Sequence, residues 1–74
     1  MRTLGAIASE IRADWKPVNF AALPYLDAMA QLETVKDSFV CDSGATIVAY
    51  FLANSGTWKG ETARRIKAEL RRLL

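Results

Sequence analysis

The chain has 74 residues, a formal net charge of +2 and no histidine. This length suits one domain with a thin stability margin, which we expect to span residues 1–74. Without histidine the chain lacks the usual base of serine and cysteine nucleophiles and the commonest zinc ligand. Its four glycines match no phosphate-binding loop. We therefore expect a protein that is not an enzyme, with no catalytic residues, metal or cofactor.

The cysteine content and hydropathy indicate the compartment. One cysteine cannot form an internal disulfide, whereas small secreted domains usually carry several. Cys41 is interpreted as a small buried hydrophobe. The sequence has no apolar run of about 18 residues and no apolar leader before Glu10. We therefore expect a cytoplasmic protein with no membrane partner.

The first predicted helix covers about Thr3 to Trp15. Thr3 is a plausible N-cap, and Pro17 disfavours helical backbone at the residue before it. The apolar residues recur at spacings of three and four, which places them on one stripe. They are Leu4, Ile7, Ala8, Ile11 and Trp15. The stripe predicts the face that this helix buries.

The second predicted helix runs from Pro24 to about Leu32, after a short turn capped by Asn19. Proline suits the first helical turn, where its missing N–H is not needed. Its core-facing residues would be Leu26 and Met29, with Ala22 or Tyr25. Residues 34–43 show no clear period and are predicted to be a loop. We expect Phe39 and Val40 to pin that loop to the core.

The third predicted helix covers Gly44 to Asn54, with Asp42 or Ser43 as its N-cap. Its apolar residues cover most of the circumference, which is typical of a central helix. Tyr25 and Tyr50 are interpreted as core residues with the hydroxyl at the edge. The alternative is a buried strand, because Ile, Val, Tyr and Phe favour strands. Length, flanking alanines and the lack of a partner strand favour the helix.

The fourth predicted helix begins with Thr57 as its cap and reaches the end of the sequence. One arc of this helix is apolar: Trp58, Thr62, Ala63, Ile66, Leu70, Leu73 and Leu74. Gly60 is interpreted as admitting a close neighbour, such as another helix or the Trp58 ring. The four predicted helices indicate an all-α fold, a compact bundle of short helices with crossed packing.

The charge is divided unevenly along the chain. Residues 57–74 hold six basic and two acidic residues, giving +4, whereas residues 1–56 hold four basic and six acidic residues, giving −2. The candidate partner-binding residues are Lys59, Arg64, Arg65, Lys67, Arg71 and Arg72. Such a basic face can be simply solvated, or it can bind an acidic protein surface, nucleic-acid phosphates or a membrane surface.

Two observations argue against the nucleic-acid alternative. Glu61 and Glu69 interrupt the cationic arc, and no exposed aromatic residue interleaves with it. The third and fourth helices with Gly56 between them also invite comparison with a helix-turn-helix. That comparison is weak, because Leu52 would occupy a position that the motif fills with a small residue.

Several short motifs form a distinctive series along residues 3–74. They are Pro24-Tyr25-Leu26-Asp27-Ala28-Met29, Asp42-Ser43-Gly44, Ile47-Val48-Ala49-Tyr50-Phe51-Leu52, Trp58-Lys59-Gly60-Glu61, Ala63-Arg64 and Lys67. The series resembles a group of small, mostly uncharacterised proteins carried by bacterial phages and other mobile elements. The resemblance implies a bacterial host cytosol, where such proteins often occupy a surface of a larger host protein. Inhibitors of host defence systems, including anti-CRISPR proteins, act in this way.

We therefore predict a small non-enzymatic binding protein that contacts a host protein with an acidic surface. The alternative is a nucleic-acid-binding accessory protein that uses the same basic helix. A further alternative is a homodimer that buries surplus apolar residues. Those residues would be Val18, Phe20, Val35 and Phe39.

Overall fold

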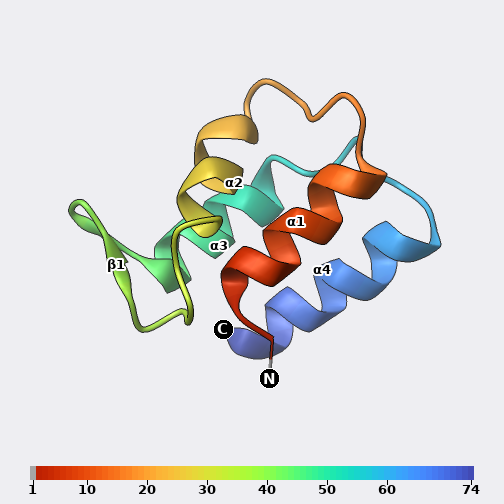
Figure 1. Cartoon of the computed structure of the whole chain (residues 1–74). Helices are drawn as coiled ribbons and strands as arrows, with labels where there is room; N and C mark the ends of the chain where they lie inside the picture. Colours follow the sequence, from red (N-terminus) through yellow and green to blue (C-terminus); the bar gives the residue numbers. More distant parts are fainter. Residues whose placement is uncertain (1) are drawn as a thin grey trace.

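The computed structural model describes residues 2–74, which form four helices and one short hairpin (Figure 1). The helices are α1 (Leu4–Asp14), α2 (Leu23–Met29), α3 (Gly44–Ala53) and α4 (Glu61–Leu73). The two strands, β1 (Ser38–Phe39) and β2 (Asp42–Ser43), pair antiparallel. The prediction of a compact, mostly helical fold with about four helices is confirmed, although the hairpin means that the fold is not a pure bundle.

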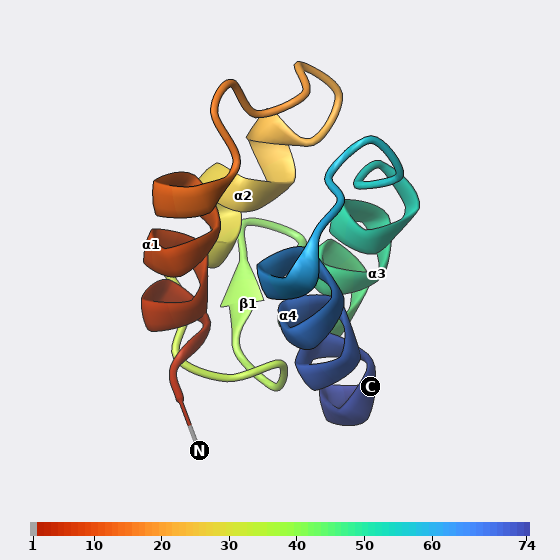
Figure 2. The same ribbon diagram turned by 90° about the vertical axis from the view of Figure 1, so that its right-hand side faces the viewer.

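The four helices form a closed ring around the core. Helix α1 contacts α2 and α4, and α3 contacts the same two helices from the other side. Helices α1 and α4 lie side by side and run in opposite directions (Figures 1 and 2). Helix α2 lies across the direction of α1 (Figure 1). No helix within residues 2–74 has the length and apolar character needed to cross a membrane.

Three aromatic rings lie at one end of this core. The Trp15 and Trp58 rings are stacked with centroids 5.5 Å apart, and Phe51 meets both edge-on at 6.2 and 6.4 Å. The Trp58 indole N–H also donates to Asp14 Oδ2 at 2.9 Å. Aromatic pairs of this kind contribute about 0.5–1.5 kcal/mol beyond their buried area. The cluster therefore fixes the segment before α4 against α1 and α3.

Helix α1 begins where the sequence predicted. The Thr3 hydroxyl accepts the Ala6 N–H at 3.0 Å, which satisfies one of the unpaired amides of the first turn. The predicted apolar stripe is buried, and Trp15 is the C-cap rather than a helical residue. Two further first-turn amides, those of Leu4 and Gly5, donate to the carbonyls of Glu33 and Leu32.

Helix α2 ends earlier than predicted, and the residues that follow it make these contacts with α1. The Asn19 turn forms as expected, because the Asn19 carbonyl accepts the Ala22 N–H at 2.9 Å. Helix α2 then starts one residue before Pro24 and ends at Met29 instead of about Leu32. The tighter turn that follows directs the Leu32 carbonyl toward α1. Leu26, Met29 and Ala22 are buried, as predicted.

The loop predicted for residues 34–43 contains the hairpin, and two expectations for it are wrong. Val40 is 85% exposed and Cys41 is exposed, because both lie in the turn between the strands. Phe39 packs against the core as expected. The hairpin leads directly into α3, where a Cβ on Gly44 would lie 2.8 Å from the Thr34 carbonyl oxygen. Glycine is therefore required for this close approach.

Helix α3 is capped by Ser43, whose hydroxyl accepts the Thr46 N–H at 3.2 Å. Only one face of the helix is buried, although its sequence is apolar almost all round. Tyr50 was expected in the core but is 53% exposed, and it stacks on Tyr25 with ring centroids 5.4 Å apart. The hydroxylated rings thus cover each other at the surface between α2 and α3.

Helix α4 begins at Glu61 with Gly60 as its N-cap, three residues later than the predicted cap at Thr57. The Trp58 N–H donates to the Ser55 carbonyl at 3.0 Å, and this turn carries Trp58 into the core before the helix starts. Gly60 has φ +112°, a conformation that other residues rarely adopt. The expected close neighbour of Gly60 is not found among residues 2–74, where a Cβ at this position would meet no atom within 4 Å. The glycine serves the backbone and not the packing.

Candidate binding surface on the last helix

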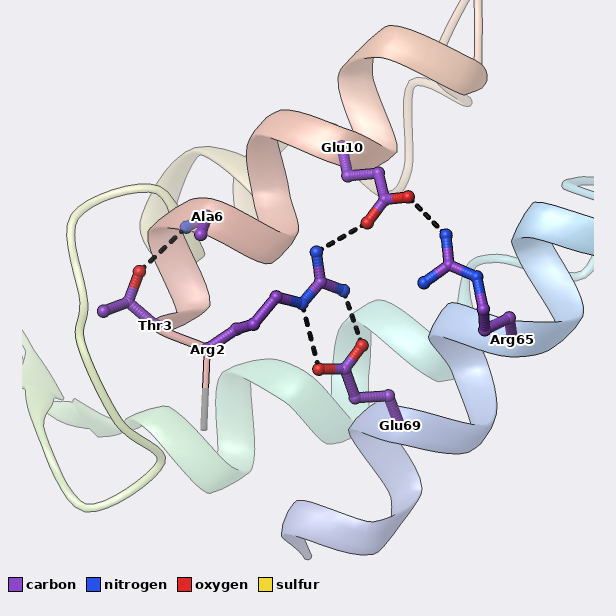
Figure 3. A network of polar contacts seen from close by, with 6 residues as sticks. All are labelled: Arg2, Thr3, Ala6, Glu10, Arg65 and Glu69. Carbon is purple, nitrogen blue, oxygen red and sulfur yellow. Dashed lines mark hydrogen bonds and ion pairs between the residues drawn. The ribbon is translucent and has the colours of Figure 1, made fainter.

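An ion-pair network joins α4 to α1 and to the segment before α1 (Figure 3). The Arg2 guanidinium donates to both carboxylate oxygens of Glu69, at 3.1 Å from Nε and 2.5 Å from Nη2. It also donates to Glu10 at 2.6 Å, and Arg65 donates to the other oxygen of Glu10. Two cations and two carboxylates therefore neutralise one another between the helices.

The network shifts the pKa values of its members in the directions expected of paired charges. Hydrogen bonds from Arg2 and then Arg65 lower the pKa of Glu10, and the hydrogen bonds from Arg2 lower that of Glu69. The pKa of Arg2 is raised, first by its hydrogen bonds to Glu69. All four side chains remain partly exposed, so solvent weakens their attraction. These contacts tie α4 to α1. We call the side of α4 that carries Arg65 and Glu69 the paired flank.

The paired flank changes the interpretation of two residues. Arg65, one of the predicted partner-binding residues, donates to Glu10 instead of standing free. Glu69, which interrupts the cationic arc in sequence, is held toward α1 by Arg2 (Figure 3). Both changes depend on contacts between residues more than 50 positions apart, and no local sequence pattern indicates them.

Four other cations form what we call the basic flank of α4: Lys59, Arg64, Lys67 and Arg71. Arg64, Lys67 and Arg71 follow one side of the helix at spacings of three and four. Lys59, Arg64 and Arg71 are exposed. None of the four makes an ion pair within residues 2–74, where the paired cations are Arg2, Arg12 and Arg65.

Lys67 has a structural role that the sequence did not indicate. Its ammonium donates to the carbonyls of Ser55 at 2.8 Å and Trp58 at 2.6 Å, and it lies 5.9 Å from the Trp58 ring centroid. Burial lowers the pKa of Lys67, and the nearby charges of Arg71 and Lys59 lower it further. Lys67 therefore fastens the turn before α4 while adding charge to a region already rich in cations.

A pocket of about 350 Å³ opens beside the basic flank, and we call it the α4 pocket. Its lining includes three predicted site residues, Lys59, Arg64 and Lys67. The remaining lining residues are Gly56, Trp58, Gly60 and Ala63. The structure therefore gathers half of the predicted set around one cavity whose lining contains no acidic residue.

Arg72 lies apart from this pocket. It lines a second cavity of about 370 Å³. The other lining residues are Arg2, Leu4, Glu33, Thr34, Val35, Lys36 and Leu73. The predicted set is thus divided among three surroundings: the paired flank, the basic flank and this second cavity.

The acidic and cysteine side chains were compared with the arrangement that a metal ion requires. Within residues 2–74, no group of three or more cysteine, aspartate or glutamate side chains is arranged to hold a metal ion. The functional interpretation therefore rests on charge and shape around α4. No family model, curated protein or solved structure matches the chain.

Proposed function

We propose that this chain is a non-enzymatic protein-binding module that places the basic flank of α4 against an acidic surface of its partner. The observation that carries the proposal is the contrast in pairing. The four cations of the basic flank, three on α4 and Lys59 just before it, have no ion-pair partner within residues 2–74, whereas Arg65 and Glu69 on the other side of the helix are paired with Glu10 and Arg2. Complementary potentials of this kind steer association and define its orientation.

The electrostatics of Lys67 support this proposal. The pKa of Lys67 is lowered by burial and then by the like charges of Arg71 and Lys59. These cations therefore repel one another, and no salt bridge within residues 2–74 offsets that repulsion. An acidic partner would relieve this repulsion on binding, which makes a favourable contribution to affinity.

The partner is proposed to be a bacterial host protein, and inhibition of a host defence system is the narrower form of this proposal. Both steps rest on the resemblance to small phage proteins. The unpaired cations of the basic flank indicate only the chemistry of the contact, and they would suit any partner with an acidic surface.

The test compares two double variants with the same change in net charge. Arg64→Glu with Arg71→Glu reverses two cations of the basic flank, and Lys16→Glu with Lys36→Glu reverses two exposed cations elsewhere. A partner is first captured from a bacterial lysate, identified by mass spectrometry and purified for titration calorimetry. We expect the first variant to lose affinity by about tenfold or more, because each tenfold corresponds to only about 1.4 kcal/mol.

The control variant should keep its affinity within about threefold, since exposed charges at a distance are screened by salt. Circular dichroism checks that both variants retain helix content. Equal losses in the two variants, or no loss in either, would show that the basic flank does not make the contact.

A nucleic-acid interface is the second candidate, and one observation favours it. Because Arg2 holds Glu69 toward α1, this residue does not interrupt the basic flank. Against it, Trp58 is only 2% exposed and cannot stack on a base. Fluorescence anisotropy with a short DNA duplex at increasing salt tests this candidate. Affinity that falls steeply with salt, and that is lost in Arg64→Glu/Arg71→Glu, would favour it over the protein contact.

A further inference from the structure

We propose that the α4 pocket is the anion-binding subsite of the basic flank and takes one aspartate or glutamate side chain of the partner between Lys59, Arg64 and Lys67. This inference rests on the proposed function and adds a defined contact point to it. A basic surface alone offers diffuse attraction, whereas a pocket lined by three cations places one carboxylate.

The donors in the pocket are arranged for such a group. An ammonium has three N–H donors, and the two carbonyl contacts of Lys67 leave one of them for the pocket. Those same contacts hold Lys67 in place, so that little side-chain entropy would be lost on binding. Lys59 and Arg64 add exposed donors from the same lining.

The two glycines of the pocket supply its room. A Cβ added at Gly56 or Gly60 would meet no atom within 4 Å, so both positions border open space. The positive φ of Gly60 sets the turn that brings Lys59 and Arg64 to one cavity. A volume of about 350 Å³ accommodates an acidic side chain with accompanying water.

The lining favours a carboxylate on an aliphatic stem over a nucleic-acid phosphate. Lys59, Arg64 and Lys67 line the pocket with long aliphatic stems below their charged ends, which suits the methylene groups of glutamate. A nucleic acid would instead gain from an exposed aromatic ring beside the cations, and Trp58 is buried. A bound carboxylate would also raise the lowered pKa of Lys67 by supplying an opposite charge.

The first test uses small probes and needs no partner. The ¹⁵N-labelled protein is titrated with N-acetyl-glutamate methylamide, with the isosteric glutamine compound as the matched neutral control and with inorganic phosphate as a third arm. We expect saturable shifts of the Gly56, Lys59 and Gly60 amides with the glutamate compound alone. Shifts spread over all surface cations, or equal shifts with the glutamine compound, would overturn the subsite. Tighter binding of phosphate would overturn its assignment to a carboxylate.

The second test closes the pocket without changing any charge. Gly56→Leu adds an isobutyl group to the lining of the pocket at a position that meets no atom within 4 Å, and Ala13→Leu places a leucine at an exposed position of α1. We expect Gly56→Leu to weaken the glutamate response and partner affinity by about tenfold, and Ala13→Leu to change neither. If Gly56→Leu binds the partner normally while Arg64→Glu/Arg71→Glu does not, the subsite is wrong and the proposed function stands.

A further variant keeps the proposal testable if Gly56→Leu does not fold. Lys59→Gln with Arg64→Gln removes two exposed pocket cations and retains Lys67, which fastens the turn. We expect this variant to lose the saturable glutamate shifts with unchanged helix content. Retention of those shifts at wild-type affinity would contradict the proposal.

Discussion

Arginines lie on both flanks of α4, but only those on one flank are paired with carboxylates. On the paired flank, Arg65 and Glu69 are neutralised by Glu10 and Arg2. On the basic flank, Arg64 and the cations beside it make no ion pair within residues 2–74. Helix α1 lies against one flank and brings Glu10 to it, and the segment before α1 brings Arg2 (Figure 3). Whether a charged residue on a helix forms an internal ion pair or remains available to a partner therefore depends on what packs beside it.

The largest expected effect comes from removing the aromatic support of the basic flank. Trp58→Ala deletes the stack on Trp15, the edge contact with Phe51 and the hydrogen bond to Asp14. We expect a loss of about 3–5 kcal/mol, because large-to-small changes leave a cavity in the core. Urea denaturation followed by circular dichroism measures it. Phe20→Ala is the control and should change stability by less than about 0.5 kcal/mol, because Phe20 is 87% exposed.

The turn before α4 gives the next effect. Gly60→Ala forces alanine into the positive-φ conformation and should destabilise the protein by about 1–3 kcal/mol. Gly56→Ala meets open space at a backbone angle outside that region and should stay within about 0.5 kcal/mol of wild type. Urea midpoints of the pair separate backbone strain at Gly60 from the effect of the added methyl group, which both variants share. Equal midpoints would show that Gly60 is not fixed by its conformation.

Adjacent arginines test the comparison between the flanks directly. Arg65→Glu places a carboxylate beside Glu10 and removes the hydrogen bond that Arg65 donates, so we expect a clear decrease in the urea midpoint. Arg64→Glu, one position away, should change the free energy of unfolding by no more than about 0.5 kcal/mol, because Arg64 has no ion-pair partner within residues 2–74. Similar midpoints for both variants would abolish the distinction between the flanks.

The smallest expected effect is the dependence of stability on pH. We expect it to come from the ion pairs of the paired flank. The pKa values of Glu10 and Glu69 are lowered on folding, first by hydrogen bonds from Arg2. Their contribution is therefore complete above the usual glutamate pKa of about 4.3 and is lost as the pH falls through the lower folded-state values. Urea denaturation from neutral to acidic pH should show this decrease. Arg2→Met should flatten it, and an unchanged profile in that variant would assign the dependence to other groups.

Much of the secondary structure follows from residues within a few positions of one another. Thr3 caps α1 as the sequence predicted, and Ser43, one of two predicted candidates, caps α3, because a hydroxyl reaches an amide only three residues away. The stripe on α1 is buried because helical spacing alone places Leu4, Ile7 and Ile11 on one side. Prediction of a helix start fails where a residue that can cap a helix can also lie in a turn before it. Thr57 resembles an N-cap, but stacking of Trp58 on Trp15 delays the helix to Glu61.

The candidate site also depends on contacts between residues that are far apart in the sequence. The sequence by itself determined that cations concentrate in residues 59–72 and follow an amphipathic helix. Only the tertiary structure decided which of them are paired, because Arg2 meets Glu69 and Arg65 meets Glu10 across 67 and 55 positions of the chain. It also created the α4 pocket by bringing the turn before α4 beside the helix itself. Charge is a property of the residue, whereas its availability depends on neighbours that only packing supplies.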